Sequence, residues 1–241
     1  MEFVLVHGAW HGAWCWEALV PVLEGRGARV ATPELPGHGA DTTPASEVTL
    51  DAYVDRVVAA VEAASGPVEL VGHSMGGIVI SAVAERVPDR VRGLTYLCAF
   101  LPRNGEVLGR LGAEDTESAL NPAIRPGPVD GTLGVDETLA PDIFYQDCPD
   151  EAVRGALARL TPQPVAPLQT PVHLTDGAFG RVPRAYVLCT EDRAVTPTMQ
   201  RTLIERSPCD PVLELACGHS PFIADPEALA DALLSIAGER S

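Results

Sequence analysis

The clearest chemical signal in the chain is the pentapeptide Gly72-His73-Ser74-Met75-Gly76, which fits the pattern G-x-S-x-G. It lies between an apolar run at 68–71, expected to be a strand, and a segment of helical periodicity that reaches Arg86. Such a junction is so tight that the flanking positions hold little more than hydrogen, and the serine hydroxyl projects from it. The alternative is a glycine-rich turn with an inert serine. The context predicts instead that Ser74 is the nucleophile of an acyl transfer.

A serine hydroxyl is a poor nucleophile without a base, and six histidines are candidates for that base. His219 follows the last expected strand and precedes the final helix, which places it at the carboxyl edge of the sheet beside Ser74. Asp192 follows the preceding strand and would orient the imidazole, with Glu191 as the competing acid. The loop after the expected strand at 94–99 offers no nearby carboxylate. The sequence therefore predicts a catalytic triad of Ser74, Asp192 and His219.

Acyl transfer also requires backbone N–H groups that bind the developing oxyanion. Met75, directly after Ser74, is expected to supply one of them. The loop after the first strand is expected to supply the other from Ala9, and Gly8 lets that backbone approach the substrate. We interpret His7 as a structural hydrogen-bonding residue rather than a proton shuttle.

A further set of residues lies beside these motifs or in the apolar middle of the chain, and is predicted to contact the substrate. Its members are Gly8, Trp10, His73, Phe144, Tyr145 and Ser220. Trp14 and Trp16 are interpreted as core residues under the same loop.

The elements that position these residues follow from hydrophobic periodicity. Strands are expected at 3–6, 29–31, 68–71, 94–99, 184–189 and 212–215, and helices at 50–64, 75–86 and from Asp225-Pro226 onward. Thr49 is expected to cap the first of these helices. Strands that alternate with helices predict an α/β fold with a doubly wound, mostly parallel sheet of about six strands.

The middle of the chain breaks this alternation, because eleven of the 22 prolines fall between positions 102 and 183. Clear helical periodicity is left only near 150–160. A disordered linker is the alternative, but the apolar residues of the segment favour an ordered cap. We therefore predict a core formed by 1–101 and 182–241, with a cap or lid insertion at 102–181.

Composition excludes several function classes. All seventeen basic residues are arginine, so chemistry that depends on a lysine amine is excluded. The net charge of −16 opposes binding to nucleic acid or anionic membranes. No secretory signal is apparent, and the six cysteines show neither disulfide nor metal-site spacing. We expect a cytoplasmic protein with reduced thiols, no metal and no cofactor.

Four blocks together resemble one branch of a known superfamily. They are FVLVHGAWHGAWCW at 3–16, GHSMGG at 72–77, VLCTED at 187–192 and Gly218-His219. In this order they resemble the α/β-hydrolase branch of plant methylesterases and hydroxynitrile lyases, with bacterial esterase relatives. The resemblance implies the α/β-hydrolase fold and a serine esterase that acts on a small methyl or aryl ester with an apolar acyl part. It also implies a homodimer, since members of the branch often form dimers.

Two positions separate the esterases of this branch from its lyases. The lyases carry threonine where this sequence has Gly8, and lysine where it has Ser220. The threonine hydroxyl handles the cyanohydrin oxygen and the ammonium stabilises cyanide, so their absence favours an esterase. A hydroxynitrile lyase or C–C bond hydrolase with the same triad, and a non-catalytic small-molecule receptor, are the alternatives.

Overall fold

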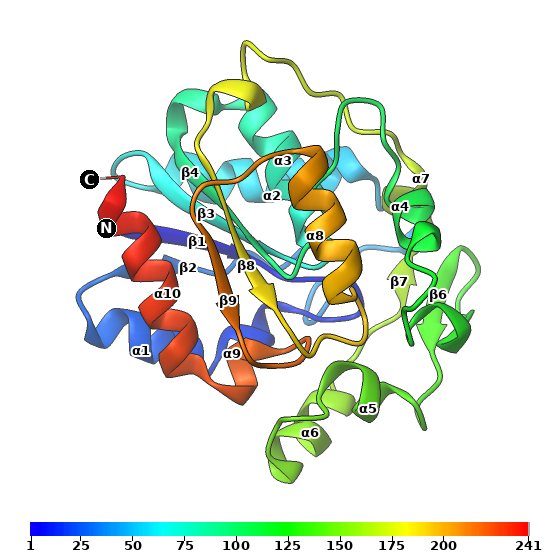
Figure 1. Ribbon diagram of the computed structural model, residues 1–241. Coiled ribbons are helices and arrows are strands. Elements are labelled where there is room, and N and C mark those ends of the chain that lie inside the picture. The colour runs from blue at the N-terminus through cyan, green and yellow to red at the C-terminus, as the bar shows by residue number, and fades with distance from the viewer. Residues whose placement is uncertain (241) are drawn as a thin grey trace.

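A parallel sheet with helices on both faces forms the centre of the computed structural model, which describes residues 1–240 (Figure 1). Within these residues, six strands follow one another in the order β2-β1-β3-β4-β8-β9, and every neighbouring pair is parallel. The strands are β1 (Glu2–Val6), β2 (Arg29–Ala31), β3 (Val68–His73), β4 (Val91–Leu97), β8 (Arg184–Cys189) and β9 (Val212–Leu215). The prediction of a doubly wound parallel sheet is confirmed.

Two layers of helices cover the sheet, as the alternation of side chains along β1 shows. Phe3 and Leu5 pack on one face, whereas Val4 and Val6 pack on the other. The first face is covered by α1 (Leu19–Gly25), α9 (Pro221–Ala224) and α10 (Pro226–Glu239). The second is covered by α2 (Leu50–Ala63), α3 (Gly76–Arg86) and α8 (Pro197–Arg206). Strands β1, β3, β4 and β8 are buried on both faces, whereas the edge strands β2 and β9 are partly exposed.

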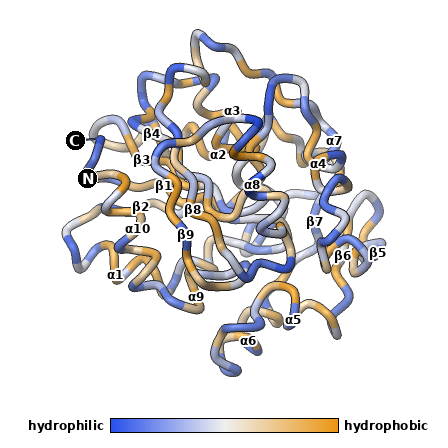
Figure 2. The backbone as a smooth tube through the Cα atoms, viewed as in Figure 1, coloured by the Kyte–Doolittle hydropathy of each residue, from blue (hydrophilic) through white to orange (hydrophobic). Residues whose placement is uncertain are grey.

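Helix starts follow the capping residues of the sequence. Thr49 accepts a hydrogen bond from the N–H of Ala52 at 3.1 Å, as predicted. Asp225 accepts one from the N–H of Ala228 at 3.0 Å, with Pro226 as the first helical residue of α10. Both helices alternate hydrophobic and hydrophilic residues, as expected for one buried face (Figure 2).

The predicted bounds of the fourth strand were wrong. We expected 94–99, but β4 runs from Val91 to Leu97. Its start is extended because Val91 pairs with Val68 of β3. Its end is fixed by Cys98, whose φ of 36° lies in the left-handed region and cannot continue a strand.

The chain between β4 and β8 forms helices and a second small sheet, most of which the sequence pattern did not indicate. The helices are α4 (Leu108–Glu114), α5 (Ala140–Phe144), α6 (Asp150–Leu157) and α7 (Val165–Gln169). The strands β5 (Ile124–Pro126), β6 (Thr132–Val135) and β7 (Gln163–Pro164) pair antiparallel. Short 3-10 helices lie at Ala13–Trp16, Ala45–Glu47, Pro88–Arg90, Asn121–Ala123 and Phe179–Arg181. Leu111, Phe144 and Tyr145 are each at most 2% exposed and anchor this segment.

The lengths of the helices show whether any of them could cross a membrane. The longest helices given above, α2 and α10, have fourteen residues each, against the roughly 20 needed to cross a bilayer. No helix among residues 1–240 is long and apolar enough to span a membrane. All six cysteines are free, in agreement with the expected reduced thiols.

Candidate active site

Ser74 occupies a strained turn between β3 and α3. Its φ of 53° lies in the left-handed region, which is unusual for a residue with a side chain. A Cβ atom on Gly76 would lie 2.6 Å from the carbonyl oxygen of Val6, and one on Gly72 would lie 2.7 Å from the backbone of Gly76. The steric reason given for the two flanking glycines therefore holds in the structure.

Asp192 and His219 form a buried hydrogen-bonded pair at the carboxyl edge of the sheet. The Nδ1 atom of His219 lies 2.7 Å from Oδ2 of Asp192, and the residues are 1% and 3% exposed. The other oxygen of Asp192 accepts from the backbone N–H groups of Ala194 at 2.8 Å and Val195 at 3.0 Å. Glu191, the competing acid, is exposed. The geometry supports Asp192 as the carboxylate that orients the imidazole.

The serine turn is tied to the histidine loop through His73. Nε2 of His73 donates to the carbonyl oxygen of His219 at 2.9 Å, and the two rings lie 4.5 Å apart. Within residues 1–240 the hydroxyl of Ser74 makes no hydrogen bond of its own. Catalytic hydrogen bonds of this kind often tighten only when substrate is bound.

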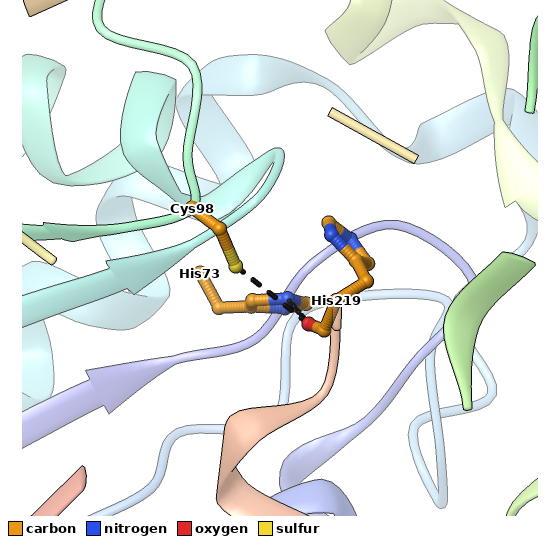
Figure 3. A group of neighbouring side chains, drawn as sticks. All are labelled: His73, Cys98 and His219. Carbon is orange, nitrogen blue, oxygen red and sulfur yellow. Dashed lines mark hydrogen bonds between the residues drawn. The ribbon is translucent and has the colours of Figure 1, made fainter. Parts of the chain in front are cut away.

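A cysteine completes a group with these two histidines, drawn in Figure 3. The ligand-type atoms of His73, Cys98 and His219 all lie within 4.8 Å of one another. The Cys98 thiol lies 3.6 Å from the carbonyl oxygen of His219, which also accepts from His73. Burial raises the pKa of the Cys98 thiol to about 12. We interpret the group as support for the backbone of His219.

Ala9 and Met75 are the two residues whose backbone N–H groups the sequence assigns to the oxyanion. Both residues line one cavity together with Ser74. Met75 precedes helix α3, whose N-terminus carries the positive end of the helix dipole. A Cβ on Gly8 would lie 2.9 Å from Cβ of Ser74, so this loop lies directly against the serine turn. Ala9 and Met75 therefore both lie at the cavity of Ser74, and their role as an oxyanion hole stays a prediction.

The cavity that contains Ser74 has a volume of about 450 Å³. Its walls come from the serine turn, the first loop and the inserted segment, and most of them are apolar. The lining residues include Trp10, Phe100, Leu108, Leu120, Ile124, Leu133, Val165, Leu168 and Ala194, with Asn121 and Gln169 as polar members. This volume fits a small ligand whose larger part is apolar.

Of the six residues predicted to contact substrate, Trp10 lines this cavity, and the other five do not belong to its described lining. Gly8 and His73 pack behind Ser74. Tyr145 is 1% exposed, with its hydroxyl 2.8 Å from Nε2 of His11. We therefore correct the prediction that Tyr145 contacts the substrate, because its hydroxyl makes this buried hydrogen bond with His11 instead.

Phe144 and Ser220 are buried beside His219. Phe144 is 1% exposed, and its ring centre lies 5.8 Å from that of His219. Ser220 is fully buried, and its hydroxyl has no hydrogen-bond partner among residues 1–240. Neither side chain belongs to the lining of the cavity around Ser74, and both are buried.

Two supporting residues were missed by the sequence analysis. Gln200 of α8 is fully buried, with its Nε2 atom 3.3 Å from Oδ2 of Asp192 and 2.7 Å from the carbonyl oxygen of Val195. His11 is 1% exposed, and its Nδ1 atom lies 2.8 Å from the carbonyl oxygen of Ala9. Neither carries a sequence signal, since a glutamine in a helix and a histidine in a loop are most often structural.

A parallel sheet with a strained serine after β3, and a buried aspartate–histidine pair after β8 and β9, defines the class of α/β hydrolases. Comparison with known proteins agrees. Residues 3–232 match the model of the alpha/beta hydrolase family, and the chain belongs to this family.

Its relatives place it in the methylesterase-like branch. Methylesterase 1 of Arabidopsis thaliana is 31% identical over 98% of this chain and 95% of its own length. A carbendazim-hydrolysing esterase of Nocardioides sp. strain SG-4G is 32% identical over 98% of this chain and 99% of its own. The structure of a pyrethroid hydrolase from Sphingobium faniae JZ-2 superimposes with a TM-score of 0.87 at 30% identity, covering 99% and 97% of the two chains.

Proposed function

We propose that this carboxylic ester hydrolase is a cofactor-independent serine esterase that works through an acyl-enzyme. The observation that carries the proposal is the buried Asp192–His219 pair, which His73 ties to the strained turn of Ser74 at an apolar cavity. The names of the relatives, which include methylesterase and pyrethroid hydrolase, support ester hydrolysis.

The proposed mechanism begins when His219 takes the proton of Ser74 as its oxygen attacks the ester carbonyl. The N–H groups of Ala9 and Met75 stabilise the oxyanion of the tetrahedral intermediate. Asp192 holds the imidazole with its proton on Nδ1, so that Nε2 is free to accept. His219 then protonates the departing alcohol. Water repeats the sequence on the acyl-enzyme and releases a carboxylate.

The substrate class follows from the cavity. About 450 Å³ of mostly apolar space suits the acyl part of a small methyl or aryl ester better than a polymer or a long lipid. The net charge of −16 does not oppose a neutral ester. A cytoplasmic location, a homodimer and a separate cap at 102–181 stay predictions.

The test is a screen of methyl, aryl and acetyl esters with the purified chain. The Ser74→Ala protein serves as the blank, because it keeps the fold and the cavity but lacks the nucleophile. Turnover of at least one ester by the unaltered chain, and not by the blank, is expected. Equal turnover by both proteins, or none in any ester, would overturn the proposal.

A hydroxynitrile lyase is the alternative with the same triad. The lyase threonine would stand at Gly8, where even a Cβ atom would lie 2.9 Å from both Nδ1 of His73 and Cβ of Ser74. The backbone here has no room for that side chain. Mandelonitrile is therefore expected to persist with the enzyme, which a benzaldehyde assay measures.

Hydrolysis is expected to slow as the solution becomes more acidic, because a protonated His219 has no lone pair with which to accept the serine proton. Burial lowers the pKa of His11 to about 4, and it lowers the pKa values of His7 and His73 well below their ordinary range. These three rings are therefore neutral near pH 7 and do not supply a protonation step there. The measurement is kcat/KM between about pH 5 and about pH 8. A flat profile would count against His219 as the base.

Trp10 is expected to limit the length of the acyl group. Its indole lines the cavity of Ser74 and also a second cavity of about 650 Å³ that includes Leu157 and Leu160. Trp10→Ala should join the two cavities and raise the ratio of kcat/KM for p-nitrophenyl octanoate over acetate by about tenfold or more. The ratio cancels any general damage to the neighbouring oxyanion hole. Trp14→Ala, at a tryptophan outside both linings, is the control, and an unchanged ratio in Trp10→Ala would refute the assignment.

A further inference from the structure

Three consecutive residues of the inserted segment each bind a different loop of the candidate site. They are Tyr145, Gln146 and Asp147, between α5 and α6. Tyr145 contacts the loop after β1 that contains Ala9, which we call the oxyanion loop. Gln146 contacts the loop of the acid Asp192, and Asp147 contacts the loop of the base His219. These three loops follow different strands. The loops of Asp192 and His219 also bond to each other directly, through the N–H of Glu191 and the carbonyl oxygen of Cys217 at 3.0 Å.

The first contact reaches the oxyanion loop through His11. The Nδ1 atom of His11 lies 2.8 Å from the carbonyl oxygen of Ala9, which can only accept, so Nδ1 carries the proton. Burial favours the neutral ring, and Nε2 is therefore a lone pair. The Tyr145 hydroxyl lies 2.8 Å from Nε2 and must donate to it. A chain of two hydrogen bonds thus runs from the inserted segment to the backbone of Ala9.

The other two contacts reach the loops of Asp192 and His219. Nε2 of Gln146 donates to the carbonyl oxygen of Glu191 at 2.8 Å, next to Asp192. The carboxylate of Asp147 accepts from the N–H of Gly218 at 2.6 Å, next to His219.

The contact of Gln146 with Glu191 depends on a glycine at position 218. A Cβ atom at position 218 would lie 2.4 Å from Nε2 of Gln146. Any side chain there would push Gln146 away from Glu191. The glycine before the candidate base therefore serves the contact with the inserted segment.

We propose that Tyr145, Gln146 and Asp147 are positioning residues that hold the oxyanion, acid and base loops at their working distances. The inference rests on the proposed esterase function. In this arrangement the inserted segment does more than shape the substrate cavity, because it also pre-organises the groups that stabilise the transition state. Misplacement of such groups by about 1 Å can lower the rate by about 100-fold.

The test compares Tyr145→Phe and Asp147→Ala with the unaltered enzyme on p-nitrophenyl acetate. Each variant is expected to lower kcat by about tenfold or more, with KM changed by less than about twofold. Affinity for a trifluoromethyl ketone, which mimics the tetrahedral intermediate, should fall in parallel with kcat/KM. Affinity for the acetate product should stay constant, and a merely structural role would not produce this split.

Matched variants provide the controls. Tyr53 is also fully buried with its hydroxyl near a histidine, His38, but that ring bonds to Pro36 and Gln163 rather than to Ala9. Tyr53→Phe should therefore leave kcat unchanged. Asp147→Asn keeps an acceptor for the N–H of Gly218 and should restore most of the rate lost in Asp147→Ala.

The outcomes separate this inference from the function on which it rests. If the unaltered chain hydrolyses esters and both test variants, folded by circular dichroism, keep full kcat, the positioning role is refuted. A loss that is equal in Tyr53→Phe would refute it as well. If the unaltered chain hydrolyses no ester in the screen, the proposed function itself fails.

Discussion

Replacing Ser74 with alanine is expected to lower kcat/KM for p-nitrophenyl acetate by at least about 10⁴-fold, the scale on which serine hydrolases depend on their nucleophile. Alanine removes the only atom that can form the acyl-enzyme. The turn itself should survive, because its geometry rests on Gly72, Gly76 and the bond from the N–H of residue 74 to the carbonyl oxygen of Leu97. A residual rate above that of water is expected from the N–H groups of Ala9 and Met75.

The measurement has two parts, steady-state kinetics and labelling with a fluorophosphonate. Intact mass spectrometry should show one adduct on the unaltered chain and none on Ser74→Ala. Ser81→Ala is the matched control, since Ser81 is fully buried in α3 with its hydroxyl bonded to the carbonyl oxygen of Gly77. It should keep both labelling and turnover. An adduct on Ser74→Ala would place the nucleophile elsewhere.

The sequence was sufficient to predict those residues of the candidate site whose placement depends on local sterics and on strand order. Ser74 could be predicted because a G-x-S-x-G turn between a strand and a helix has few other solutions. His219 and Asp192 could be predicted because residues after parallel strands meet at one edge of the sheet. The prediction of Ser74 needs only the local sequence, and that of His219 and Asp192 needs only the order of the strands, which the apolar runs indicate.

The structure of the inserted segment could not be predicted from apolar runs and strand order. Its strands are two to four residues long, too short for a periodic pattern, so the sheet β5-β6-β7 had no signal. Tyr145 was expected in the substrate pocket because it lies in the apolar middle of the chain. Its hydroxyl instead meets His11, 134 positions earlier, and only the folded chain brings them together.

Replacing Asp192 with asparagine is expected to lower kcat by about 10³-fold to 10⁴-fold, as for the corresponding change in other serine triads. The volume hardly changes, and the amide oxygen can still accept from the N–H groups of Ala194 and Val195. The amide nitrogen then faces Nδ1 of His219 and donates to it. The ring proton moves to Nε2, where it blocks acceptance of the proton from Ser74.

A change of the His219 tautomer has other consequences than a general loss of charge from the site. KM should change little, and the fluorophosphonate should label Ser74 slowly in Asp192→Asn, because the nucleophile is present but lacks its base. Glu191→Gln removes the neighbouring, exposed carboxylate and should be nearly silent. If Glu191→Gln loses more activity than Asp192→Asn, the acid of the triad is Glu191, and the 2.7 Å contact of Asp192 with His219 has only a structural role.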